Sequence, residues 1–293
     1  MRIDLKTSFE QKPLALDFIW HGFLSGTVGA LVSPGGVGKS YWALLAAMAI
    51  ACRVKGGDLL EIKPHKTGKV VYIAGEDPCS VIAQRIHSIG GHFTDQAKEE
   101  ITKNLVIESM MGERLDIMSE AGIKRVLSLA DKPRLIILDT LSRIHQLDEN
   151  SNRDMALLIT RLEQLAVISG ASVLFLHHVS KTSGRDANTD QRSSRGASAL
   201  IDNSRWCGYL TPMTPEESSR WFEKDSVTPI GVNSAQKYLR FGENKRNFAS
   251  AKEGAQWYQR SEEGVLVCVT LHPASGQVGH RKPAPRSKKA ANA

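Results

Sequence analysis

The chain has 293 residues, of which 41% are hydrophobic and 24% are charged. These values are typical of a globular protein with one large domain or two small ones. Because the sequence has no run of eighteen apolar residues and no apolar signal region, we expect a soluble, cytoplasmic protein with no membrane partner. The four cysteines are scattered without C-x-x-C spacing, which argues against a zinc site and a disulfide framework.

Short apolar runs alternate with amphipathic segments over residues 27–178, after an N-terminal arm (residues 1–26) that is available to pack on a neighbouring subunit. Predicted strands cover residues 27–33, 69–75, 105–109, 134–140 and 172–178, and predicted helices cover residues 41–52, 80–90, 119–130 and 153–169. Strands that are apolar throughout and alternate with helices indicate a parallel sheet buried on both faces.

From about residue 206 the pattern changes to short runs with aromatic residues and turns, such as KYLRFGE and GVLVCVT. We expect antiparallel strands that extend the same sheet. Since no strong linker divides the chain, we predict one α/β domain over residues 27–271, with a central, mostly parallel sheet flanked by helices. Residues 272–293 contain five basic and no acidic residues, and we expect a disordered tail that either aids solubility or tethers nucleic acid weakly.

The stretch SPGGVGKS resembles a phosphate-binding loop, G-x-x-x-x-G-K-[ST], with Ser33 in place of the first glycine. It lies between a predicted strand and an Ala/Leu-rich helix, as this motif requires, so backbone N–H groups can surround the phosphates of ATP. The expected nucleotide-binding residues of this segment are Ser33, Gly35, Gly36, Val37, Gly38, Lys39, Ser40 and Tyr41. The simpler alternative is a Gly-rich turn before a helix.

The departure at position 33 has a conformational explanation. Pro34 restricts the preceding residue to extended conformations, so Ser33 can end the strand while the later glycines supply the turn. Lys39 would bind phosphate as a point charge, and the hydroxyl of Ser40 would bind Mg²⁺.

Acidic residues follow two further predicted strands. Asp139 lies at the C-terminal end of the strand in RLIILDT, and because parallel strands end at one edge of a sheet, it should lie beside the loop and hold Mg²⁺ with Ser40. Glu76 and Asp77 follow KVVYIAG; we expect Glu76 to be the base that orients the attacking water and Asp77 to help position metal or water. Alternatively, Asp139 ends a strand in an ordinary turn and Asp77 caps the next helix.

Five stretches together resemble the RepA-type plasmid replicative helicases, which are hexameric motors with a RecA/DnaB-like P-loop fold. They are SPGGVGKS, YIAGEDP, LIILDT, FLHHVSK and SRGASALIDNSRW, and the similarity runs from about Leu14 to about residue 270. The resemblance implies an ATP-hydrolysing ring of six identical subunits, with single-stranded DNA in its channel and 5′→3′ translocation. A primase and an origin-binding protein would be separate partners.

The resemblance also implies roles for single residues. Glu76 lies where RecA/DnaB-type ATPases carry the catalytic glutamate, and His178 lies where a polar residue contacts the γ-phosphate, with His177 as second choice. Arg205, the arginine before a tryptophan, would be the finger that reaches the neighbouring subunit's nucleotide.

The segment FGENKRNF resembles the K-x-R-N element that DnaB-type helicases insert at the same interface. Asn244 occupies one cation position, which leaves Lys245, our expected nucleotide contact, and Arg246. Arg195 is a further candidate for the cation that acts on the neighbour.

Residues 181–196 form a long, polar, Gly/Ser-rich segment without aromatic residues. In a ring it would face the channel and follow the phosphate backbone of DNA. The expected nucleic-acid contacts are Lys181, Arg185, Arg192 and Arg195. The same composition suits a lid over a nucleotide, so two alternatives stay open: a P-loop kinase of small molecules, and a non-motor RecA-like ATPase that binds single strands.

Overall fold

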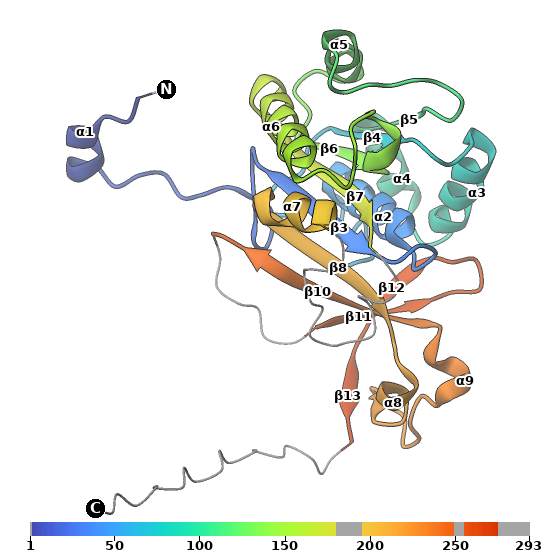
Figure 1. Cartoon of the computed structure of the whole chain (residues 1–293). Coiled ribbons are helices and arrows are strands. Elements are labelled where there is room, and N and C mark those ends of the chain that lie inside the picture. Colours follow the sequence, from blue (N-terminus) through green and yellow to red (C-terminus); the bar gives the residue numbers. More distant parts are fainter. Residues whose placement is uncertain (1, 180–194, 249–254, 275–293) are drawn as a thin grey trace, which may run out of the picture.

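A nine-stranded mixed sheet organises the protein in the computed structural model, which describes residues 2–179, 195–248 and 255–274 (Figure 1). The strand order is β12-β11-β10-β8-β3-β7-β6-β4-β5. These strands are β3 (Val28–Ser33), β4 (Val70–Ala74), β5 (Leu105–Ser109), β6 (Leu135–Asp139), β7 (Ser172–His178), β8 (Trp206–Pro212), β10 (Tyr238–Arg246), β11 (Gln256–Arg260) and β12 (Leu266–Val269). Pairing is parallel from β8 to β5 and antiparallel from β8 through β10 and β11 to β12.

Helices cover both faces of the sheet. One core contains side chains of the helices α2 (Lys39–Ala51), α3 (Cys79–Gly90) and α4 (Asp95–Asn104). The other contains side chains of α5 (Glu120–Ser128), α6 (Asn152–Ser169) and α7 (Arg195–Asn203). Smaller elements are α1 (Leu5–Glu10), β1 (Phe18–Trp20), β2 (Phe23–Leu24), the 3-10 helix η1 (Leu141–Arg143), α8 (Pro215–Ser218), β9 (Trp221–Glu223), α9 (Val232–Ala235) and β13 (Leu271–Pro273).

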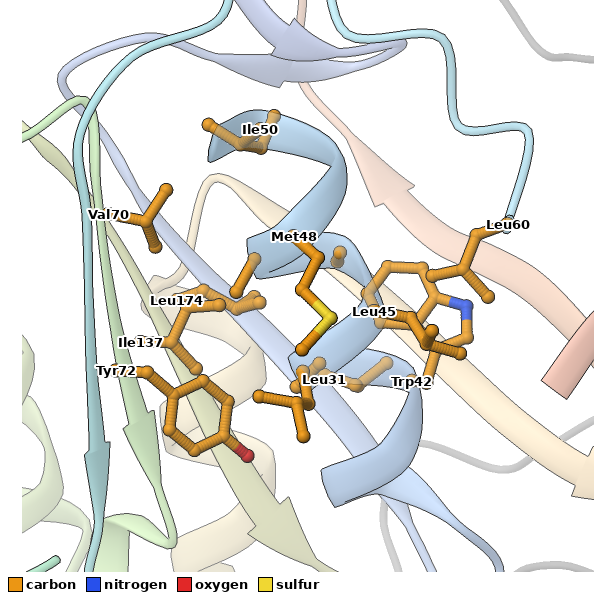
Figure 2. Close-up of a cluster of buried hydrophobic side chains, with 14 of the residues drawn as sticks. Leu31, Trp42, Leu45, Met48, Ile50, Leu60, Val70, Tyr72, Ile137 and Leu174 are labelled. Carbon is orange, nitrogen blue, oxygen red and sulfur yellow. The ribbon is translucent and has the colours of Figure 1, made fainter. Parts of the chain in front are cut away.

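The architecture confirms the predicted α/β class, a mostly parallel sheet flanked by helices with antiparallel C-terminal strands, consistent with a RecA-like P-loop fold. The predicted helix over residues 153–169 forms as part of α6, and its apolar side chains are buried against the sheet. In the other core, helix α2 is apolar on nearly all sides because it contacts parallel strands of the sheet, the C-terminal strand β12 and helix α4. Figure 2 shows Trp42, Leu45 and Met48 of α2 among Leu31, Ile137 and Leu174 of the strands.

Part of the segment predicted as an N-terminal arm packs in the core. Strands β1 and β2 form a hairpin whose Trp20 and Phe23 are buried, and the Phe23 ring stacks on Trp206 with centroids 5.4 Å apart. Aromatic burial holds the hairpin in place. By contrast, α1 lies away from the body of the molecule (Figure 1) and has no buried residue. No helix in the described part of the chain is long and apolar enough to cross a membrane.

The close packing around the hairpin predicts a cost for one added methyl group. A Cβ atom at Gly29 of β3 would lie 2.9 Å from a ring carbon of Phe23 and 3.1 Å from one of Trp206, both in the buried core. We expect Gly29→Ala to lower the free energy of unfolding by about 1–3 kcal/mol, measured by urea denaturation.

The matched control is Gly90→Ala at the end of α3, where a Cβ atom would meet no other atom within 4 Å. It should change the free energy of unfolding by less than about 1 kcal/mol. Equal stability of the two variants would contradict the packing described for the hairpin.

Candidate active site

The carboxyl ends of β3, β7, β6 and β4 open onto a cleft of about 340 Å³. Its lining residues are Gly36, Gly38, Lys39, Ser40, Tyr41, Glu76, Asp77, Arg85, Asp139, His178, Arg260 and Gly264. The topology therefore brings together residues from all three predicted strand ends and the predicted loop. Ser33, Gly35 and Val37 belong to the loop but do not line the cleft.

The loop has the backbone that its glycines allow. Ser33 is the last residue of β3, as expected, and Gly36 and Gly38 adopt positive φ angles of 77° and 114°. A side chain would strain both positions. Gly38 is also the N-cap of α2, whose first turn carries no acidic residue. The backbone N–H groups and the positive end of the helix dipole therefore face the cleft, and no carboxylate of that turn neutralises them.

Lys39 is buried and is held by neutral groups. Its Nζ atom lies 2.9 Å from Ser33 O, 3.1 Å from Ser33 Oγ and 3.0 Å from His178 Nδ1. Burial lowers the pKa of Lys39 to about 8, while Asp139 and Glu76 partly oppose this effect. No carboxylate of the described residues lies within ion-pair distance of the ammonium group. Its charge is therefore left for an anion that enters the cleft.

Asp139 is positioned by a buried tyrosine that the sequence analysis did not identify. The hydroxyl of Tyr72 on β4 donates a hydrogen bond of 2.5 Å to Asp139 Oδ2. Burial raises the pKa of Asp139, and hydrogen bonds from Tyr72 and Ser40 oppose that shift. The carboxylate is thus oriented from two sides at the base of the cleft.

The oxygen ligands present fit Mg²⁺. Asp139 and Ser40 offer a carboxylate and a hydroxyl, and their side chains are within hydrogen-bond contact of each other. Mg²⁺ at nucleotide sites takes one or two protein ligands and completes its shell with phosphate oxygens and water. Accordingly, a cluster of three or more His, Cys, Asp or Glu ligands is not needed, and none is present among the described residues.

His178 connects Lys39 with Glu76. Because its Nδ1 atom faces an ammonium group, Nδ1 must accept a hydrogen bond and the proton belongs on Nε2, which lies 3.9 Å from Glu76 Oε2. Burial and the charge of Lys39 lower the pKa of His178, which favours this neutral form. Glu76 also lies 3.5 Å from the Nε atom of Arg143.

His177, the second choice, points away from the cleft because neighbouring strand residues face opposite sides of the sheet. Burial lowers its pKa to about 4, as for a neutral core residue. The geometry favours His178 for a contact with a ligand.

Asp77 does not cap α3, contrary to the alternative given above. The N-cap is Pro78, and both carboxylate oxygens of Asp77 accept hydrogen bonds from Arg85, at 2.5 and 3.2 Å. The guanidinium of Arg85 also lies over the Tyr41 ring, 5.3 Å from its centroid. Arg85 therefore fixes Asp77 and Tyr41 at the mouth of the cleft.

Arg205 and Lys245 lie at the edge of the sheet where the parallel strands β3 and β8 begin, opposite the edge that carries the cleft. Arg205 directly precedes β8, and its N–H donates to Val28 O at the start of β3. Lys245 on β10 donates to the carbonyl groups of Ile201 and Asp202 at the end of α7. Neither residue lines the cleft of its own chain.

The expected DNA contacts Lys181, Arg185 and Arg192 lie outside the described residues. Arg195 is the first residue of α7, and its side chain is also outside the described part.

Sequence reasoning missed Tyr72, Arg85 and Arg260 as site residues. Arg85 had a detectable position, on the helix that starts just after the predicted catalytic carboxylates. Tyr72 gave a weaker sequence signal, because it is a residue with a polar group within an otherwise apolar strand. Arg260 gave no sequence signal, because it reaches the loop from a strand more than 200 residues later in the chain.

The fold and the cleft define a P-loop ATPase. The buried Lys39 follows a glycine-rich loop at the start of α2, and it shares the cleft with Asp139 at the end of β6. Comparison with known families agrees, since residues 3–184 match the family AAA_25, described as an AAA domain. The match covers more than half of the chain. The protein therefore belongs to this AAA domain family of P-loop ATPases, which bind nucleotide and usually Mg²⁺.

The role assigned to Tyr72 gives a test. Tyr72→Phe should lower the free energy of unfolding by about 1–3 kcal/mol, because the charged acceptor Asp139 loses a buried donor. It should also raise the Mg²⁺ concentration for half-maximal ATP hydrolysis by about tenfold, since Asp139 is no longer oriented.

The control is Tyr209→Phe, which removes a hydroxyl that makes no hydrogen bond within the described residues and does not line this cleft. It should leave the Mg²⁺ requirement unchanged. An unaltered requirement in Tyr72→Phe would show that the tyrosine does not position the carboxylate.

Proposed function

We propose that this protein is a DNA helicase of the RepA type: a hexameric ring that couples ATP hydrolysis to 5′→3′ translocation on single-stranded DNA and unwinds duplex for plasmid replication. The observation that carries the proposal is the location of Arg205 and Lys245 together at the sheet edge opposite the phosphate loop. Cations at that edge serve ATP hydrolysis only when a second copy presents its cleft to them.

The separation of the two edges follows from strand register. Arg205 bonds to Val28, the first residue of β3, whereas the loop begins after Ser33, the last. Five steps along a strand span about 17 Å, which is longer than an arginine side chain. The Arg205 side chain is half exposed and its nearest carboxylate, on Glu163, is 3.8 Å away. Such a weakly paired surface cation is free to bind a phosphate of a neighbour.

Within one cleft, each of the described side chains would have a separate role in ATP hydrolysis. Glu76 would accept a proton from the attacking water, and Lys39 would bind the phosphates. Mg²⁺ held by Ser40 and Asp139 would neutralise charge on the phosphate oxygens. Arg205 of a neighbouring copy would stabilise the charge that develops in the transition state, so that hydrolysis depends on correct docking.

His178 would report the state of the nucleotide. In the structure it accepts a hydrogen bond from Lys39 and faces Glu76. A γ-phosphate would compete for the ammonium group and release the imidazole. Because His178 ends β7, the change would pass to residues 181–196, where Lys181, Arg185, Arg192 and Arg195 are the proposed contacts with the DNA backbone.

The N-terminal helix supports the proposed ring. Helix α1 has six residues and no buried side chain, and its apolar Leu5 and Phe9 are exposed. A helix this short is only marginally stable alone, so it needs a packing partner. A neighbouring copy in the ring would provide that surface.

The first test of this function is the unwinding of a forked DNA by the wild type with ATP and Mg²⁺. Lys39→Ala should abolish ATP hydrolysis and unwinding with an unchanged circular dichroism spectrum, because the phosphate-binding charge is lost. The exposed Lys55→Ala is the control and should act as the wild type. Binding of single strands without unwinding would favour the non-motor ATPase, and phosphate transfer to a small acceptor would favour the kinase.

The second test concerns action between subunits. Arg205→Ala should bind ATP normally but hydrolyse it about a thousandfold more slowly, as expected for an arginine finger. Mixing it with Lys39→Ala should restore part of the activity, since mixed rings contain interfaces with both groups intact. Arg53→Ala, which removes an exposed arginine away from the cleft, is the control. Wild-type turnover in Arg205→Ala, or mixtures without any recovery, would contradict the assignment.

A further inference from the structure

A hairpin near the C-terminus lies against the phosphate loop of its own chain. Arg260, the last residue of β11, donates a hydrogen bond from Nη2 to the carbonyl of Val37 in the loop. A Cβ atom at Gly38 would lie 3.0 Å from the same nitrogen. The glycine therefore leaves the space that the guanidinium group occupies, and Arg260 forms part of the cleft lining.

A second contact fastens the turn of this hairpin to α2. The hydroxyl of Tyr41 donates a hydrogen bond of 2.7 Å to the carbonyl of Glu263. At Gly264, which has a φ of 88° and also lines the cleft, a Cβ atom would meet the Tyr41 ring at 3.0 Å. The loop and the first turn of α2 are thus both in contact with the β11–β12 hairpin.

Among the described residues, the charge of Arg260 is not balanced by an acidic group. No carboxylate of the described residues forms an ion pair with it, unlike Arg85, which pairs with Asp77, and Arg240, which pairs with Glu217. Arg260 is half-buried, and burial lowers its pKa. A partly desolvated guanidinium that contacts only a carbonyl oxygen has donors left for an anion, and planar oxyanions are its best partners. Phosphate is the anion expected at this cleft.

We propose that Arg260 is a nucleotide-binding residue, supplied by the β11–β12 hairpin of the same chain that carries the loop. Its guanidinium binds the phosphate chain while it holds the Val37 carbonyl, so occupation of the cleft stabilises the hairpin in its closed position. This inference rests on nucleotide binding at the loop and does not depend on DNA. It gives the cleft a further cation in cis besides Lys39, distinct from the cations proposed to act on a neighbour.

The test compares Arg260→Gln and Arg260→Lys with Lys237→Gln by measuring ADP and adenosine binding in a titration without DNA. Loss of hydrogen bonds to a charged group should weaken ADP binding about tenfold or more in Arg260→Gln. Arg260→Lys should be intermediate, because it keeps the charge but not the planar fork. Lys237→Gln removes an exposed charge just before β10, at a residue whose carbonyl accepts a hydrogen bond from the backbone N–H of Arg260, and should bind ADP within about twofold of the wild type.

Hydrogen exchange supplies the second readout. ADP should slow amide exchange in residues 256–268 of the wild type and of Lys237→Gln, and this protection should be lost in Arg260→Gln. Adenosine binding should be equal in all variants, because the contact is to phosphate. Wild-type ADP affinity in Arg260→Gln, or an equal loss for ADP and adenosine, would overturn the proposal. A wild type that binds ADP but unwinds no DNA would contradict only the helicase function.

Discussion

The buried ammonium group of Lys39 is the interaction on which the rest of the site depends. Its partners are all neutral: Ser33 and His178, at the ends of two adjacent strands, and the carbonyl of Pro34. The nearby carboxylates lie beyond ion-pair distance. This arrangement keeps a positive charge available in a partly dry cleft, where it interacts strongly with an anion. A phosphate that binds Lys39 must change the hydrogen bonding of His178 and, through it, the surroundings of Glu76.

The site was predictable where it depends on local patterns. Apolar runs identified the parallel strands, and because such strands end at one edge, Lys39, Asp139 and His178 could be expected together. Contacts between distant segments had no comparable pattern. Arg260 reaches Val37 across the fold, and the strands around Trp20 and Phe23 are only three and two residues long, too short for a period to be recognised.

Strand β10 connects the two edges of the sheet that matter for the proposed motor. Its first residues pair with the end of β11, next to Arg260, and Leu239 lies close to Gly38 of the phosphate loop. Its last residues include Lys245 and pair with the start of β8, next to Arg205. Over nine residues the strand spans about 27 Å. One rigid element therefore joins the cleft of a subunit to the edge that would serve its neighbour.

In the proposed ring, the cleft is incomplete without a second copy of the chain. The most direct measurement is the rate of ATP hydrolysis per subunit over a range of protein concentrations, with the assembly mass determined by light scattering at each one. We expect negligible turnover for the monomer and a rate per subunit that increases in proportion to the fraction of assembled rings. A monomer that hydrolyses ATP at the full rate would contradict it.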